Sequence, residues 1–400
     1  MPSDVRAEGR SARYRIVMLI DGLGSGGAQR QFTYLSCGLA RRGHDVAVAV
    51  YNDQDHYADA ITSAGIPIAR LPKPSRFSFR PVFALVKLYQ DRRAQAVVAF
   101  LRSPAAKAEL ARLLDPAINV IAAERSVYPE PRLPLLLRLT HGLHRLATFI
   151  TTNSQHQLIR MKRLSPGSAR RMTCIANAIP LPANVAAVRP RVAENLRILA
   201  ISSLMPKKHS VMVAEALALL RDEYGITASV SWLGETFAHL GEYGAYRETC
   251  ATIARLDLAD QWTWLGAQKN VDDFLLAHDV LLHSSSVEGS SNAVCEAMAI
   301  GLPVIAGSIA DHASLLEETG AGLLFESHTP RSIAATVARF SQLDAETRAA
   351  MGKAGRSIIE TEFAEARMVD HYEALIAASI AGRGIPRELT GQEDLRACAV

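Results

Sequence analysis

The sequence lacks the apolar segments that would place it in a membrane. No uninterrupted apolar run reaches the ~18 residues that a spanning helix needs. The opening residues, Met-Pro-Ser-Asp-Val-Arg, lack the apolar core of a signal peptide. Both absences lead us to expect a cytoplasmic protein.

Cysteine and histidine are too scattered to organise a site. The 5 cysteines include no Cys-x-x-Cys pair, and the 12 histidines show no His-Glu-x-x-His spacing. An odd number of isolated thiols does not predict a disulfide framework. Without ligands at metal spacing, we expect no metal site.

The composition is that of a soluble protein with room for two domains. Hydrophobic residues make up 49% and charged residues 21% of the 400 residues, which is ordinary for a globular chain. A single core rarely grows this large, so we expect two domains of about 180 to 200 residues each.

Charge is distributed unevenly along the chain. Residues 1–190 contain 27 Lys and Arg against 12 Asp and Glu, a net +15, whereas residues 191–400 contain 17 against 28, a net −11. A basic first half indicates an anionic partner such as a membrane surface, a diphosphate-lipid acceptor or a nucleic acid. A solvated, arginine-rich surface without such a partner is the alternative.

Short apolar runs alternate with helical patterns along the chain. In the first half, segments with apolar residues at helical spacing separate the apolar runs 15–20, 45–50, 96–100 and 119–123. This alternation is typical of a doubly wound parallel sheet. It resumes at residue 196, so the whole chain is expected to be α/β.

The stretch 288–298 is the strongest candidate for a ligand site. Glu288 lies in a loop of small residues, and Glu296 lies about two helical turns further along. The free N–H groups of a helix N-terminus attract an anion such as phosphate, and carboxylates accept hydrogen bonds from sugar hydroxyls. A ligand on the first turn would therefore contact one carboxylate at each end. The alternative is an ordinary α/β unit with two solvated glutamates.

The pattern around these glutamates, namely Glu, seven residues, Glu, then Ala-Met and Gly-Leu-Pro-Val, resembles the donor site of the retaining glycosyltransferases of family 4, which have the GT-B fold. The resemblance implies two Rossmann-like domains on either side of a cleft. It also implies metal-independent transfer, with retention, of a hexosyl or N-acetylhexosaminyl unit from a nucleotide sugar, without a cofactor. A UDP-sugar is expected as donor rather than a GDP-sugar.

The acceptor that the resemblance implies is a hydroxyl of a lipid-linked or cell-envelope polysaccharide intermediate. Together with the basic first half, it predicts an enzyme at the inner face of the cell membrane. Such an enzyme would make peripheral contact with anionic lipid and would have no nucleic-acid partner.

The resemblance also assigns roles on the donor side. Glu288 would hold the hydroxyls of the donor sugar, Glu296 the ribose and Lys208 the diphosphate. Glu288 and Lys208 are therefore the candidate catalytic residues. The candidate donor-binding residues are Gly26, Gly27, Lys207, Lys208, Gly234, Glu288, Ser291, Asn292, Ala293, Val294 and Glu296.

Two departures from the family pattern leave a second function open. Ser203 stands where an arginine normally accompanies the lysine, and the segment 101–104 lacks the histidine that members often carry there. Fixed cations stabilise the charge of a departing nucleoside diphosphate, and losing one preorganised donor costs about 3 to 4 kcal/mol. A non-catalytic GT-B protein that binds nucleotide sugars is therefore the alternative.

Three charged residues are candidates for the acceptor side. Glu124 and Arg125 follow the predicted strand 119–123 and resemble the Glu-Arg motif of members that extend lipid-linked chains. Arg102 follows the predicted strand 96–100. The carboxyl ends of parallel strands are where such folds bind ligands. The alternative for Glu124 and Arg125 is an ion pair in a loop.

The expected order along the chain is a tail, two domains, a crossover helix and a second tail. An apolar helix is also expected at 133–147, either in the core or in a membrane interface. The boundaries are 1–14 for the tail, 15–185 for the acceptor-binding domain, 186–363 for the nucleotide-sugar-binding domain, 364–379 for the crossover helix and 380–400 for the second tail.

Glycines near the N-terminus raise a third function. Gly22, Gly24 and Gly27 form a Gly-x-Gly-x-x-Gly pattern after a predicted strand. Asp53 follows the next strand, where a dinucleotide fold places its ribose-binding carboxylate. A nicotinamide-dependent oxidoreductase would use these residues. The same segment, Gly-Gly-Ala-Gln-Arg at 26–30, also resembles the glycine loop that in family 4 lies against the donor phosphates.

Overall fold

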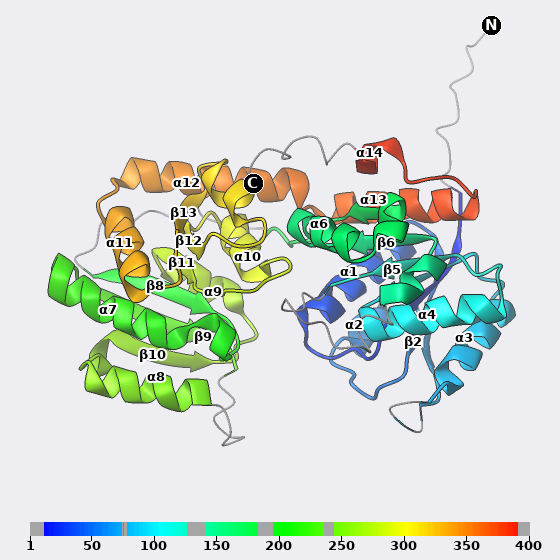
Figure 1. Ribbon diagram of the computed structural model, residues 1–400, viewed down its shortest axis with the longest axis horizontal. Coiled ribbons are helices and arrows are strands. Elements are labelled where there is room, and N and C mark those ends of the chain that lie inside the picture. Colours follow the sequence, from blue (N-terminus) through cyan, green and yellow to red (C-terminus); the bar gives the residue numbers. More distant parts are fainter. Residues whose placement is uncertain are drawn as a thin grey trace, which may run out of the picture.

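Two sheet-centred domains lie side by side in the computed structural model (Figure 1). Within the described residues, both sheets are parallel throughout and helices cover both faces of each. This arrangement confirms the expected pair of doubly wound, Rossmann-like domains. The structure describes residues 12–73, 75, 78–125, 141–182, 195–235 and 244–390.

The first domain is built on a sheet of seven described strands in the order β3-β2-β1-β4-β5-β6-β7. Its strands are short apolar runs because helices bury both of their faces. They are β1 (Arg15–Leu19), β2 (Asp45–Val50), β3 (Ile68–Arg70), β4 (Ala96–Phe100), β5 (Val120–Ala123), β6 (Phe149–Thr152) and β7 (Met172–Cys174). The helices are α1 (Gly27–Arg41), α2 (Ala58–Ser63), α3 (Arg80–Asp91), α4 (Arg102–Leu114) and α6 (Gln155–Leu164), with short turns η1 (His144–Leu146) and η2 (Pro166–Arg171).

The second domain repeats this plan with six described strands in the order β10-β9-β8-β11-β12-β13. The strands are β8 (Leu196–Ile201), β9 (Ala228–Leu233), β10 (Trp262–Gly266), β11 (Val280–His283), β12 (Val304–Gly307) and β13 (Gly322–Phe325). The helices are α7 (Ser210–Tyr224), α8 (Gly244–Arg255), α9 (Val271–Ala277), α10 (Asn292–Ile300), α11 (Pro330–Ser341) and α12 (Ala345–Glu362), with turns η3 (Pro206–Lys208), η5 (Ala259–Gln261) and η6 (Ala313–Glu317).

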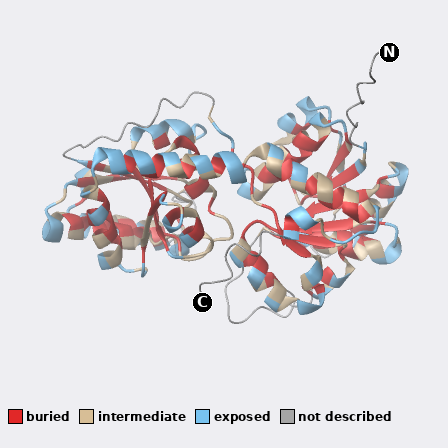
Figure 2. Cartoon of the chain, turned by 90° about the horizontal axis from the view of Figure 1, so that it is seen from above, coloured by how far each residue is buried: buried red, intermediate tan, exposed pale blue. Residues whose placement is uncertain are grey.

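Successive residues of the central strands pack into different cores. In the first domain, Met18 and Val98 belong to the cluster beneath α1, whereas Val17 and Val97 belong to the cluster beneath α3 and α4. Side chains alternate between the faces of a strand, so one apolar run supplies both cores. Figure 2 shows the result, with buried residues concentrated in the sheets and exposed residues on the outer faces of the helices.

Helix α13 (Glu365–Ile380) returns from the second domain and lies against the first (Figure 1). Its buried face, including Tyr372 and Val369, shares a core with α1 and β4. Ion pairs from Arg41 to Glu365 and from Arg42 to Glu373 hold α13 against α1. The last helix of one half thus completes the core of the other.

Some boundaries differ from the sequence expectation. The loose tail expected at 380–400 instead begins with ordered structure, since α14 (Arg387–Thr390) follows α13 and buries Leu389. The carbonyl oxygen of Leu389 accepts a hydrogen bond of 2.8 Å from Thr173 in β7. Most of the apolar helix expected at 133–147 lies outside the described residues. Within the described ranges, every helix is too short or too polar to span a membrane.

Candidate active site

Helix α10 forms the centre of the candidate site. It begins at Asn292, after the loop that follows β11, and ends at Gly301, whose φ of 81° is a left-handed conformation that glycine adopts without strain. Glu288 lies in the loop and Glu296 in the second turn. The two carboxylates therefore flank the first turn, whose backbone N–H groups have no partner within the helix.

A buried histidine holds the loop before α10. Nε2 of His312 lies 2.7 Å from the hydroxyl of Ser291, and Nδ1 lies 2.8 Å from the carbonyl oxygen of Gly307. Burial lowers the pKa of His312 to about 4, so the ring is neutral at pH 7. It donates from Nδ1 to the carbonyl and accepts from the Ser291 hydroxyl. Ser291 is thereby fixed at the N-cap position of α10.

Glu288 is held by two nitrogen groups. Lys208 forms an ion pair with Oε1 of Glu288, and Nε2 of His283 lies 3.4 Å from the same oxygen. Burial alone would raise the pKa of Glu288, but the hydrogen bond from His283 and the charge of Lys208 together hold that pKa well below its ordinary value. The Glu288 carboxylate is therefore ionised throughout the physiological range.

The turn that carries Lys208 is tied to the loop that carries Glu288. The carbonyl oxygen of Lys207 accepts a hydrogen bond of 3.0 Å from the Ser286 amide, and the carbonyl oxygen of Lys208 accepts one of 2.6 Å from the Ser284 hydroxyl. Of the two neighbouring lysines, Lys208 reaches the candidate site and Lys207 is exposed.

Glu296 faces the other domain. Its carboxylate forms an ion pair with Arg30 of α1, and the side chains are 17% and 29% exposed. Burial raises the pKa of Glu296, and the attraction of Arg30 offsets part of this shift. Arg30 was not among the predicted site residues, although it ends the Gly-Gly-Ala-Gln-Arg segment at 26–30.

The N-termini of α1 and α10 lie against each other where the two domains meet. A Cβ atom added to Gly27 would lie 2.9 Å from Nδ2 of Asn292. Oδ1 of Asn292 accepts a hydrogen bond of 2.9 Å from Asn177, which belongs to the first domain. Two sets of free backbone N–H groups, with the partial positive charge of two helix ends, thus point toward one region.

The other donor-side candidates contribute backbone rather than side chains. Gly234 has a φ of 147°, and a Cβ atom there would lie 2.2 Å from the carbonyl oxygen of Ser202. Only glycine therefore fits where β9 ends against the loop after β8. Val294 is fully buried, and Ala293 is partly buried in the first turn of α10.

The acceptor-side candidates Arg102 and Glu124 lie in one buried network. Nη1 of Arg102 lies 2.8 Å from Nε2 of His144, and Nε lies 3.4 Å from Oε1 of Glu124. His144 continues the network through Nδ1, 2.6 Å from Glu109. Burial lowers the pKa of His144 to about 4 and raises that of Glu109 to about 8. Arg102 follows Leu101, whose φ of 74° is rare for a residue with a side chain.

Arg125 points to a different set of partners. Its Nη1 donates to Oδ1 of Asn177 at 2.8 Å, its Nη2 donates to the hydroxyl of Tyr372, and its guanidinium lies 4.8 Å from the ring centre of Phe100. Asn177 in turn contacts Asn292, so Arg125 belongs to the joint between the domains. Glu124 and Arg125 therefore do not act as the simple loop ion pair that was the alternative.

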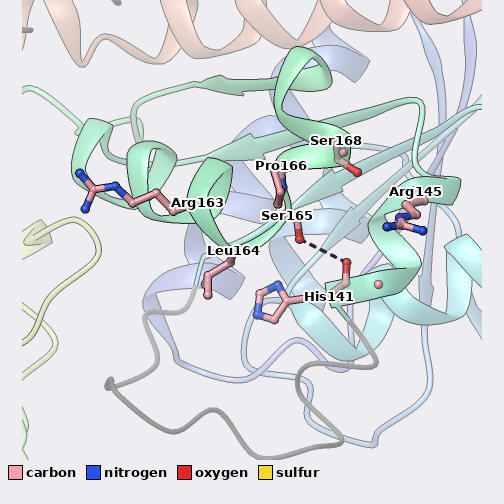
Figure 3. A pocket seen from close by; sticks show the side chains of 9 residues that line it. His141, Arg145, Arg163, Leu164, Ser165, Pro166 and Ser168 are labelled. Carbon is pink, nitrogen blue, oxygen red and sulfur yellow. Dashed lines mark hydrogen bonds between the residues drawn. The ribbon is translucent and has the colours of Figure 1, made fainter.

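Two cavities adjoin these groups in the described residues. The first, about 390 Å³, lies between η1 and the segment from α6 to η2. Figure 3 shows Arg163 and Arg145 at its two ends with His141 between them. The second, about 350 Å³, lies between the domains and is lined by the loop 289–291 on one side and by Asn153 on the other. His141 links the first cavity to the buried network, because its ring contacts Arg102.

Two models of glycosyltransferase families match the chain, one in each domain. The model "Glycosyltransferase Family 4" matches residues 25–181, and the model "Glycosyl transferases group 1" matches residues 187–358. The chain belongs to this glycosyltransferase family. The two matched regions are the first and second domains, so the cleft between them is the place to seek the site of a group 1, family 4 glycosyltransferase.

Individual relatives are more distant. The amylovoran biosynthesis glycosyltransferase AmsK of Erwinia amylovora is 29% identical over 184 residues, which are 44% of this chain and 43% of AmsK. The N-acetyl-alpha-D-glucosaminyl L-malate synthase of Bacillus anthracis is 26% identical over 123 residues, 31% of this chain and 32% of that protein. The matches thus span less than half the length of these curated relatives.

A solved structure extends the likeness over nearly the whole fold. Alr3699/HepE of Anabaena, crystallised with UDP and glucose, superposes with a TM-score of 0.77 at 19% identity, covering 92% of this chain and 100% of that one. At this identity the match shows the fold alone, and that fold is GT-B.

Family membership sets the oxidoreductase hypothesis aside. The structure agrees, because the Asp53 side chain is fully exposed and lies 3.8 Å from Arg70 rather than against the glycine loop. The glycine loop instead faces α10, where Gly27 contacts Asn292.

Proposed function

We propose that this glycosyltransferase moves a hexosyl or N-acetylhexosaminyl unit from a UDP-sugar, rather than a GDP-sugar, to an acceptor hydroxyl with retention at the anomeric carbon. The observation that carries the proposal is the arrangement on α10. An ionised Glu288, paired with Lys208, and a buried Glu296 flank a turn of free N–H groups that faces a second helix N-terminus.

Each part of a nucleotide sugar has a counterpart in this arrangement. The diphosphate would take the N–H groups at Ser291 to Val294 together with Lys208. The sugar hydroxyls would donate to the Glu288 carboxylate, which stays ionised because its pKa is lowered. The ribose hydroxyls would donate to Glu296.

In the transfer step, the bond between the anomeric carbon and the phosphate oxygen breaks while a bond to the acceptor oxygen forms on the same face of the sugar. The acceptor hydroxyl loses its proton to the departing phosphate, so no separate base is required. Lys208 and the helix N-termini stabilise the charge that develops on the nucleoside diphosphate.

The acceptor that fits best is a lipid-linked or envelope polysaccharide intermediate at an anionic membrane. At the start of α3, the N-cap residue Phe79 and Phe83 are 65% and 60% exposed and lie one turn apart. The exposed Arg80 lies between them, and the exposed Lys87, which pairs with Asp91, follows one turn later. Exposed phenyl groups among cations are typical of helices that lie in a membrane interface. The relative AmsK belongs to a polysaccharide pathway, which supports the same class of acceptor.

Vesicle flotation tests the membrane contact. The protein should float with vesicles that contain anionic lipid and remain behind with neutral ones. Replacing both phenylalanines, Phe79→Ser with Phe83→Ser, should reduce flotation severalfold. Equal behaviour on both vesicle types, or no effect of the double variant, would contradict the proposal.

A donor panel tests the transfer. The purified protein would be incubated with UDP-, GDP- and ADP-sugars and a membrane lipid extract, and nucleotide release would be measured. We expect release from one UDP-sugar, lowered about 100- to 1000-fold in Lys208→Ala and reduced in Glu296→Ala. Lys353→Ala, an exposed change on α12, is the control.

Ser203 supports one other function, a non-catalytic binding protein, because it supplies no cation where family members normally carry arginine. Under that hypothesis, the same donors would bind in calorimetry, but no nucleotide would be released with any acceptor extract. Release from any donor would rule it out.

A further inference from the structure

The ion pair between Arg30 and Glu296 involves the carboxylate that the ribose of a nucleotide-sugar donor would bind. Arg30 comes from α1 in the first domain, whereas Glu296 comes from α10 in the second. The proposed function gives the Glu296 carboxylate to the ribose. A nucleotide that binds there must therefore share or replace Arg30.

The position of Arg30 places it within reach of the diphosphate region. The N-termini of α1 and α10 meet where Gly27 faces Asn292. Arg30 follows Gly27 by one turn and Glu296 follows Asn292 by one turn. Along each helix axis, one turn corresponds to a rise of about 5 Å, so both residues of the ion pair begin close to the free N–H groups. A long side chain covers such a distance by changing rotamers.

The charges on the second domain leave a need for another cation. Lys208 is already paired with Glu288, and Ser203 contributes no charge. A diphosphate carries more than one negative charge, and arginine binds phosphate oxygens with two parallel N–H donors. Among the described residues, the guanidiniums of Arg30 and Arg125 both lie near this region, but Arg125 is held by Asn177 and Tyr372, whereas Arg30 is held by Glu296 on α10 itself.

We propose that Arg30 changes partners when the donor binds. The guanidinium that pairs with Glu296 in the structure moves to the diphosphate, and the ribose hydroxyls take its place on the carboxylate. Arg30 then supplies, from the opposite domain, the cation that Ser203 does not supply. This inference rests on the proposed function, because it assumes that a nucleoside diphosphate binds at α10.

The exchange gives the site a preference for nucleoside diphosphates over nucleosides. A nucleoside offers hydroxyls to Glu296 but no anion to Arg30, so breaking the ion pair is not compensated. A nucleoside diphosphate offers a new partner to both groups.

Calorimetric binding of uridine and UDP tests the exchange. In Arg30→Gln, UDP affinity should fall about 10- to 100-fold, whereas uridine affinity should stay unchanged or rise, because Glu296 is already free. Arg30→Lys keeps the charge and should retain most of the preference for UDP. Arg41→Gln, which removes an ion pair between α1 and Glu365 outside the site, should change neither affinity.

The other outcomes overturn the inference in distinguishable ways. An equal loss of uridine and UDP affinity in Arg30→Gln would mean that Arg30 only positions Glu296. An equal gain in affinity for uridine and UDP would mean that the ion pair only obstructs the site. If the wild-type protein binds neither UDP nor GDP, the proposed function fails and the inference with it. If Arg30→Gln does not fold, the test uses Arg30→Lys alone. Loss of the preference for UDP over uridine in that variant would contradict the exchange.

Discussion

Glu109, Glu288 and Glu296 are largely buried glutamates whose neighbours change their carboxyl groups in different ways. Lys208 and His283 overcome the effect of burial at Glu288 and lower its pKa, whereas Arg30 offsets only part of that effect at Glu296. At Glu109 burial dominates, and the pKa rises to about 8. The same residue type therefore supplies a fixed anion, a cation-dependent carboxylate and a neutral acid.

The ionised state of Glu288 should stabilise the folded protein. Its pKa is lower in the folded than in the unfolded chain, so this contribution is complete above the ordinary value of 4.5 and is lost as pH falls below it. We expect Glu288→Gln to lower the free energy of unfolding by about 1 to 3 kcal/mol at pH 7. The difference in free energy of unfolding between this variant and wild type should become smaller in acid, as measured by urea unfolding from pH 3 to 8.

Glu109→Gln should show the opposite dependence on pH. The folded protein keeps this carboxyl protonated up to pH about 8, whereas the unfolded chain releases the proton above its ordinary value of 4.5. The wild-type protein therefore loses stability across that window, and the neutral glutamine does not. In the same urea series, the free energy of unfolding of Glu109→Gln should rise relative to that of wild type as pH increases toward 8. Parallel profiles for the two glutamine variants would contradict both assignments.

At the scale of elements, the site depends on where strands and helices end. The loops after β8, β9 and β11, together with the N-termini of α1 and α10, carry the groups of the candidate site. In parallel sheets these ends lie on one edge, which is why two such edges can face each other across a cleft. Glycine is required where two of these loops approach most closely, at Gly234.

Gly234→Ala should therefore be strongly destabilising. The added methyl group would lie 2.2 Å from the Ser202 carbonyl oxygen, and the φ of 147° is unfavourable for alanine. We expect the free energy of unfolding to fall by at least about 2 kcal/mol, measured by thermal and urea unfolding. Gly244→Ala, at the start of α8 with nothing within 4 Å of the added atom, is the matched control. A loss of similar size in both variants would contradict the steric argument.

At the scale of the whole molecule, several contacts hold the two domains together. Helix α13 packs on α1, the chain Arg125–Asn177–Asn292 crosses the joint, and Arg30 pairs with Glu296. The carboxylate of Asp311 in the second domain also accepts hydrogen bonds of 2.8 and 2.9 Å from the first amides of α6. One domain thus caps a helix of the other.

Asp311→Ala should loosen this arrangement. The loss of a charged cap costs about 1 kcal/mol, and because the cap comes from the other domain, small-angle scattering should also show a larger radius of gyration. Asp344→Ala removes a cap that α12 receives from its own domain, through a bond of 2.7 Å to the Thr347 amide. That control should lose similar stability with no change in scattering. An unchanged radius in Asp311→Ala would show that the cap does not control the domain arrangement.

Much of the fold could be predicted because local patterns specify it. The expected strands at 45–50 and 96–100 match β2 and β4. The short strand β7 and the helix α14 were missed, since three or four residues carry too little pattern and pairing with a neighbour defines them.

The amino-acid sequence by itself determined the alternation of strands and helices, the two glutamates on α10 and the resemblance to family 4, because these depend on residues close together in the chain. The tertiary structure alone decided that Arg30 meets Glu296, that Glu109 and His144 share a buried network with Arg102, and that Asp311 caps α6. Such pairs are separated by tens to hundreds of residues. Only the folding of two sheets and the return of α13 bring them within hydrogen-bonding distance.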